Sequence, residues 1–115
     1  MANEEKALVP ETQEQNEDSG LVEVKLKKPL DYNGKIYESI SLDLEGLTGK
    51  DSMEVEAELM QRKKVAVIYG AMNNDYLMGI AAKACREPLG SDAFLAMSLK
   101  DYNKIKDIVR NFLLK

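Results

Sequence analysis

Several residue types that most catalytic and metal sites need are missing from this chain. Among its 115 residues there is no histidine and no tryptophan, and there is a single cysteine. The lack of histidine excludes His-based acid–base catalysis, Ser–His and Cys–His nucleophile pairs and most transition-metal sites. One cysteine leaves no internal disulfide and fits a reducing compartment. Because aromatic residues make up only 6%, Leu, Ile, Val and Met must fill any core.

Long hydrophobic runs are also absent. No apolar segment approaches the roughly 20 residues that a membrane-spanning helix needs. The start of the chain, residues 1–5, is acidic where a signal peptide would be basic. We therefore expect a cytoplasmic protein without membrane contact. No basic cluster is strong enough to predict nucleic-acid binding.

The net charge of −4 is unevenly distributed along the chain. Residues 1–20 contain six of the 20 acidic residues and one of the 16 basic residues, with few large aliphatic side chains. A segment of this composition buries too little apolar surface to offset the entropy lost on ordering. The sequence therefore predicts a disordered acidic tail over 1–20 and a single folded α+β domain over 21–115.

Two runs of alternating apolar and polar residues flank the turn sequence Asp31-Tyr-Asn-Gly34, which predicts a β-hairpin over 21–42. A two-residue loop, Asn33-Gly34, would place the apolar residues of the two strands on opposite faces. A three-residue loop over 32–34 keeps one face apolar, so we expect that register, with Gly34 at positive φ. The expected pairs are Leu30 with Ile36, Lys28 with Glu38, Leu26 with Ile40 and Val24 with Leu42.

Capping residues and helical periodicity predict the rest of the fold. Thr48 followed by Asp51 is typical of a helix N-terminus and begins a helix over 49–63. Over 65–69 we expect extended or irregular structure rather than more helix. The fold class is therefore α+β, an N-terminal β-hairpin followed by a small bundle of three to four helices. The further helices expected are one from Asn73 or Asn74 to Arg86, a short one over 92–97 capped by Ser91, and a last one from the Ser98 cap to the C-terminus.

Two of these helices have apolar stripes. In the first helix, Met53, Ala57 and Met60 form an apolar strip, which Val55 and Leu59 widen. The last helix is the most regular amphipathic segment, and part of its apolar face supplies the candidate partner-binding residues Tyr102, Ile105, Val109 and Phe112. Its basic residues, Lys100, Lys104, Lys106 and Arg110, are expected to form a solvated face. The methionines supply either core or an adaptable surface for a flexible partner: Met53, Met60, Met72, Met78 and Met97.

No group of residues predicts catalysis, a metal ion or a cofactor. Residues 46–51 are similar to the end of a phosphate-binding loop. Asp51, however, stands where that loop needs Ser or Thr, so a helix cap is the better interpretation. Cys85 lies on an apolar helix face and is expected to be a small buried hydrophobe. An enzyme is therefore the least expected class of protein.

Four segments in order resemble those of a known family. They are the strand, turn and strand of Val24–Tyr37, the segment Leu42–Asp51 leading into the first helix, Ile80–Ala84, and Leu99–Tyr102 followed by Val109–Leu113. On these residues the chain resembles the tail assembly chaperones of Mu-like and related contractile-tailed phages and prophages, over residues 22–114.

The resemblance implies a non-enzymatic chaperone that binds the tape measure protein and keeps it soluble while the tail tube assembles. Such a protein works in the bacterial host cytoplasm and is absent from the mature virion. The family often makes a longer frameshift product, which implies an extended form that recruits tail tube protein. Two other classes stay open, a small phage regulatory or adaptor protein and a structural tail component. The sequence also leaves self-association into a homo-oligomer open.

Overall fold

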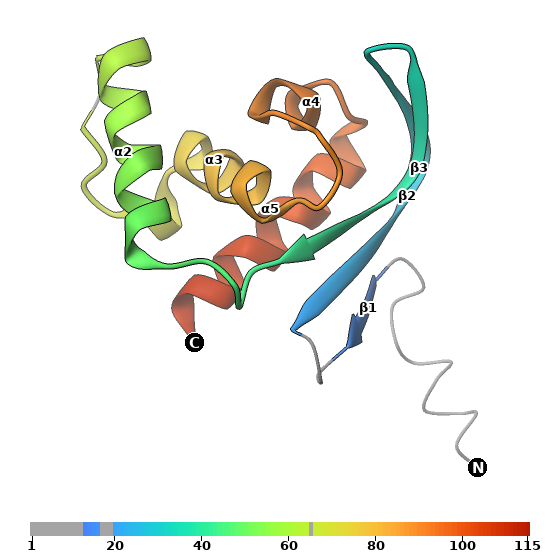
Figure 1. The fold of residues 1–115 in the computed structure, drawn as a ribbon, viewed down its shortest axis with the longest axis horizontal. Coiled ribbons are helices and arrows are strands. Elements are labelled where there is room, and N and C mark those ends of the chain that lie inside the picture. Colours follow the sequence, from blue (N-terminus) through green and yellow to red (C-terminus); the bar gives the residue numbers. More distant parts are fainter. Residues whose placement is uncertain (1–12, 17–19, 65) are drawn as a thin grey trace.

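The computed structural model describes residues 13–16, 20–64 and 66–115. In this part of the chain a β-hairpin is followed by four α-helices, so the predicted α+β class is confirmed. Figure 1 shows the hairpin and α2 at opposite ends of the molecule, with the other helices between them. The elements are β1 (Gln13–Asn16), β2 (Leu21–Tyr32), β3 (Lys35–Asp43), α2 (Gly49–Lys63), η1 (Gly70–Met72), α3 (Asn74–Ala84), α4 (Ser91–Leu95) and α5 (Leu99–Leu114).

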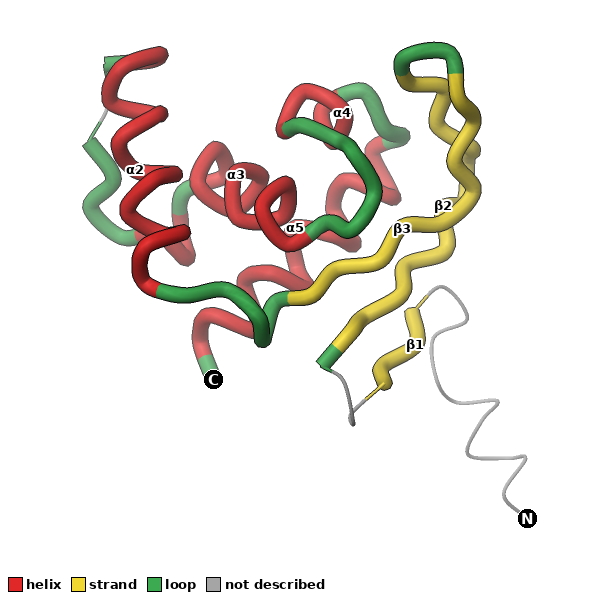
Figure 2. The backbone as a smooth tube through the Cα atoms, in the orientation of Figure 1, coloured by secondary structure: helices red, strands yellow, loops and turns green. Residues whose placement is uncertain are grey.

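The sheet has one strand more than the sequence predicts. The predicted disordered tail, 1–20, lies largely outside the described residues. Within it, Gln13–Asn16 form β1, which pairs antiparallel with the start of β2. The strand order is β1-β2-β3, and Figure 2 shows β1 beside the end of β2 that lies farthest from the hairpin turn.

The hairpin turn is tighter than predicted. Asn33 has φ 53° and Gly34 has φ 80°, which is the signature of a two-residue type I′ turn. The predicted positive φ of Gly34 is confirmed, but the predicted three-residue loop is wrong. Leu30 pairs with Tyr37 instead of Ile36, and Val24 pairs with Ile40 instead of Leu42.

An irregular segment in β2 explains why the expected register fails. The pairing shifts between Lys25 and Leu30, so residues 26–29 of β2 stand opposite Glu38 alone. Pro29 suits this break because it has no N–H to give to a strand ladder. The shift lets the favoured two-residue turn coexist with one apolar face. The buried residues of that face are Val22, Val24, Leu26, Leu30, Tyr37, Ile40 and Leu42.

Helix boundaries follow the capping residues. The first helix spans Gly49–Lys63 as predicted, with the Asp51 carboxylate accepting the Thr48 N–H at 2.9 Å. The Asn73 side chain caps α3 by accepting the Tyr76 N–H at 2.8 Å. Residues 66–69 are irregular, as preferred from the sequence, and Val65 lies outside the described residues.

Two predicted boundaries are wrong. The predicted Ser91 cap is incorrect because Gly90 is the N-cap of α4, which ends at Leu95. Helix α3 ends at Ala84, two residues early, because the chain then joins the edge of β3. There Cys85 bridges to Leu42, and the Arg86 N–H donates to the Ser41 carbonyl at 2.8 Å.

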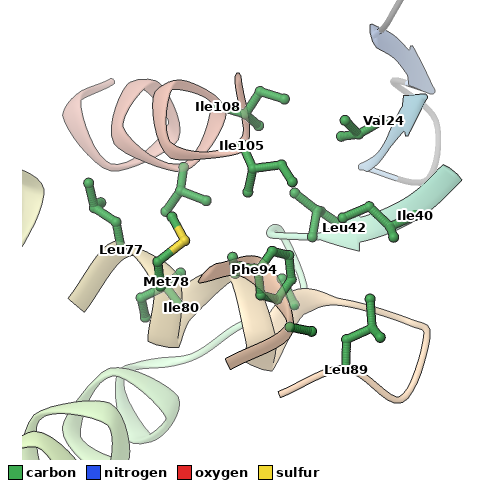
Figure 3. Packing of buried hydrophobic residues seen from close by; sticks show 14 of the residues in the cluster. Val24, Ile40, Leu42, Leu77, Met78, Ile80, Leu89, Phe94, Ile105 and Ile108 are labelled. Carbon is green, nitrogen blue, oxygen red and sulfur yellow. The ribbon is translucent and has the colours of Figure 1, made fainter. Parts of the chain in front are cut away.

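The core lies where the apolar face of the hairpin meets α3, α4 and α5. Figure 3 shows Leu77, Met78 and Ile80 of α3 beside Phe94 of α4, Ile105 and Ile108 of α5, and Ile40 and Leu42 of β3. Burying one such side chain contributes roughly 1.5–3 kcal/mol. Helix α2 lies outside this convergence and packs mainly on α3.

Candidate functional site

The residues predicted to bind a partner lie mostly in the core. Ile105 and Val109 are 0% exposed, so in this fold they present no surface to another protein. Tyr102 and Phe112 are partly buried and pack against the same core. The regular stripe of α5 therefore serves the folding of the domain.

The basic residues of α5 are also largely used within the fold. The Lys104 ammonium donates to the Lys25 carbonyl at 2.8 Å, and the Arg110 guanidinium donates to the Ala71 carbonyl at 2.8 Å. Lys106 stands over the Tyr102 ring, 5.2 Å from its centroid. The Lys104 contact attaches α5 to β2 and the Arg110 contact attaches it to η1, so the predicted solvated face is incorrect for these two residues.

Asp101 has a structural role that sequence reasoning missed. From the sequence it is only part of a cap pair with Ser98. In the structure it is fully buried, and its two carboxylate oxygens accept the Lys27 N–H at 2.9 Å and the Lys28 N–H at 3.1 Å. These are the amides that the irregular segment of β2 removes from the strand ladder. The Ser98 hydroxyl donates to the same carboxylate at 2.9 Å.

The environment of Asp101 keeps its carboxylate charged. Burial alone would raise the pKa of Asp101, but the amide and hydroxyl hydrogen bonds, with the nearby Lys104 charge, lower that pKa below its ordinary value. A buried charge is tolerated only when it is paired and hydrogen-bonded, as it is here. Asp101 therefore fixes the N-terminus of α5 to the irregular part of the hairpin. No sequence pattern signals a contact that spans 74 residues.

Most of the exposed large apolar side chains lie in another part of the chain. Nine large hydrophobic residues are exposed among the described residues, and five of them fall within residues 53–72. We call these five the exposed apolar set: Met53, Met60, Ile68, Tyr69 and Met72. They belong to α2, the irregular segment after it, and η1. Three of the five are methionines, whose flexible side chains suit contact with varied partners.

The orientation of α2 explains this exposure. The helix buries Val55 and Leu59, which are one turn apart, against α3. Gly79 of α3 allows this close approach, since a Cβ there would lie 2.6 Å from a Val55 methyl carbon. The strip of Met53, Ala57 and Met60 faces solvent on the opposite side of α2, so the prediction that Val55 and Leu59 widen it is wrong, and of the two roles left open for Met53 and Met60 the core role is excluded.

Polar contacts hold α2 in this orientation. Glu54 pairs with Lys83, the Lys63 ammonium lies 3.3 Å from the Asp75 carboxylate, and the Ser52 hydroxyl bonds to the Tyr76 hydroxyl. Exposed ion pairs contribute only about 0–1 kcal/mol each. The burial of Val55 and Leu59 therefore contributes more to the orientation of α2 than these pairs do.

The described residues offer little for chemistry. They contain no group of three or more Cys, Asp and Glu side chains placed to hold a metal ion. Burial raises the pKa of the Cys85 thiol to about 12, so almost none of it is the reactive thiolate at neutral pH. No helix in this part of the chain is long and apolar enough to cross a membrane. The exposed apolar set is the candidate site that the described residues offer.

No protein-family model, curated protein or solved structure matches this chain.

Proposed function

We propose that this protein is a non-enzymatic phage tail assembly chaperone that binds the tape measure protein and keeps it soluble while the tail tube is built. In this proposal it acts in the cytoplasm of the bacterial host and leaves before the virion is complete. The resemblance of Val24–Tyr37 and the three later segments to that family supports the proposal, and the exposed apolar set supports it independently.

The exposed apolar set is the observation that carries the proposal. None of these side chains belongs to the buried core of the described residues or packs against it. Contiguous exposed apolar patches on folded proteins mark contact sites, and these five residues lie within 20 positions of one another in the sequence. Methionine-rich surfaces can adapt to several sequences, which a chaperone for a long client requires.

Co-expression tests the proposal directly. The tape measure protein of the same genome is expressed alone and together with this chain, and its soluble fraction is measured. We expect a clear rise in soluble tape measure protein and its recovery in complex with the chain. An unchanged soluble fraction would refute the chaperone function. Finding the chain in purified particles would instead support a structural tail component.

The longer product implied by the resemblance belongs to the same proposal. In it, the short form coats the tape measure protein and an extended form recruits tail tube subunits. Mass spectrometry of the products of the native operon should show two species that share most of this sequence. A single product from an operon that still builds tails would refute the two-form arrangement and leave the simple chaperone function in place.

A further inference from the structure

Helix α2 is attached to the core along one narrow face. Of the 23 buried residues in the hydrophobic core cluster, only Val55 and Leu59 come from this helix. Its outer strip, made of Met53, Ala57 and Met60, is exposed. Helix α5 packs on β2, α3 and η1, whereas α2 packs mainly on α3 and lies at one end of the molecule (Figure 1).

The contact between α2 and α3 contains little apolar surface. Val55 packs over Gly79 of α3, which adds no side chain of its own. Polar contacts add the hydrogen bond between Ser52 and Tyr76 and two ion pairs whose side chains are at least 35% exposed. Exposed ion pairs are weakened by water and salt. The attachment of α2 therefore depends mostly on two buried side chains.

Segments without helix or strand connect α2 to the core on both sides. Before the helix, Leu44 is buried and Leu47 packs against the core. After the helix, Lys64 has φ 60°, and Val67 packs against the core. Because these residues fix the connections on either side, α2 can leave α3 while the core stays assembled.

We propose that α2 is a lid on α3, which opens as a unit while the hairpin, α3, α4 and α5 stay folded. Elements with few buried apolar contacts open locally at a lower free energy than the whole domain unfolds. The open lid uncovers Val55, Leu59 and the face of α3 around Gly79, and so enlarges the apolar surface that begins at the outer strip. This inference does not depend on the proposed function.

Hydrogen exchange in the full chain, followed by mass spectrometry, tests the lid. After correction for intrinsic rates, we expect the amides of residues 54–62 in α2 to exchange about tenfold faster, or more, than those of residues 104–111 in α5. Equal protection of the two helices would overturn the lid, because both would then open only when the whole domain unfolds.

A core substitution separates lid opening from global unfolding. Ile105→Val weakens the core, which stays assembled when the lid opens, so it should leave the exchange of α2 unchanged and speed that of α5 about fivefold. Leu59→Ala weakens a contact that is lost in both kinds of opening, so it should speed the exchange of both helices. Equal acceleration of α2 and α5 by Ile105→Val would overturn the proposal.

A disulfide between α2 and α3 supplies a closed form of the lid. A Cβ at position 79 would lie 3.6 Å from the Val55 Cβ, and disulfides need about 3.5–4.5 Å between these atoms. The variant carries Val55→Cys and Gly79→Cys, with Cys85→Ala so that only one pair can form. Val55→Cys also removes the γ carbon that a Cβ at position 79 would meet at 2.6 Å.

The reduced form of this variant is the matched control for the oxidised form. The reduced form should keep the faster exchange of α2, whereas oxidation should bring the protection of α2 to within about threefold of that of α5. A difference between the two helices that survives oxidation would show that α2 frays within itself, and would overturn its opening as a lid.

Discussion

Helices α2 and α5 are nearly equal in length, at 15 and 16 residues, and both have an apolar stripe, yet they use their stripes in opposite ways. Helix α5 packs on α3, β2 and η1, and its central apolar residues are buried. Helix α2 packs mainly on α3, buries only Val55 and Leu59, and leaves Met53 and Met60 exposed. The number of packing neighbours therefore decides whether an apolar stripe is buried or stays exposed.

Replacing a core residue of α5 should give the largest effect on stability. Ile105→Ala removes a fully buried side chain, so we expect it to lower the free energy of unfolding by about 3 kcal/mol, measured by urea denaturation. A loss below about 0.5 kcal/mol, typical of a surface site, would contradict the placement of this stripe in the core.

Replacing the carboxylate that anchors α5 should have the next largest effect. Asp101→Asn removes the charge that accepts the Lys27 and Lys28 amides, and we expect a loss of about 2 kcal/mol at neutral pH. The folded protein lowers the pKa of Asp101 below its unfolded value of about 3.9. The stability it contributes is therefore complete above that pH and is lost as pH falls through the folded pKa.

The pH dependence gives a direct check on Asp101. Urea denaturation of the natural chain and of Asp101→Asn at several pH values should show their stability difference shrinking below about pH 4. A difference that stays constant down to pH 2 would mean that the carboxylate charge is not what holds α5 to the hairpin.

Replacing Gly34 tests the turn of the hairpin to which Asp101 fixes α5. Gly34 has φ 80° and open space where a Cβ would stand, so the cost of a substitution there comes from the backbone alone. We expect Gly34→Val to destabilise the protein by about 1–2 kcal/mol. Gly49→Ala is the control, because Gly49 has open space too and no positive φ. Equal stabilities of the two variants would refute the type I′ turn.

Replacing an outer residue of α2 should give the smallest effect. Met53 is largely exposed and alanine favours helix, so Met53→Ala should change the free energy of unfolding by no more than about 0.5 kcal/mol. The same urea experiment that measures Ile105→Ala gives this value. A loss of 2 kcal/mol or more would show that the strip is part of the core after all.

The sequence predicted the parts of this fold that depend on local signals. The start of α2 follows from Thr48 and Asp51, and the start of α5 follows from Ser98, because caps act within one turn of the helix. The positive φ of Gly34 was predictable because it also depends on the local turn sequence. The register of β2 on β3 was not predictable. The irregular segment 26–29 reconciles a two-residue turn with one apolar face, and the alternation of apolar and polar residues alone does not reveal such a segment.

The candidate site was harder to predict because it depends on tertiary neighbours. Periodicity identifies an apolar stripe on a helix, but Ile105 and Met60 look equally suited to core or contact from sequence alone. The role of Asp101 is likewise invisible, because it depends on the Lys27 and Lys28 amides far away in the chain. The family resemblance suggested a partner and could not place the surface.

Measuring the solubility of the tape measure protein with variants of α2 and α5 tests the central claim most directly. The double variant with Met53→Glu and Met60→Glu changes only the outer strip, and Leu99→Glu changes an apolar residue of α5 that is as exposed as Met53. Urea denaturation should give both variants a free energy of unfolding within about 0.5 kcal/mol of that of the natural chain. We predict that the double variant fails to keep the tape measure protein soluble, whereas Leu99→Glu keeps it as soluble as the natural chain does. Full activity of the double variant would contradict the account.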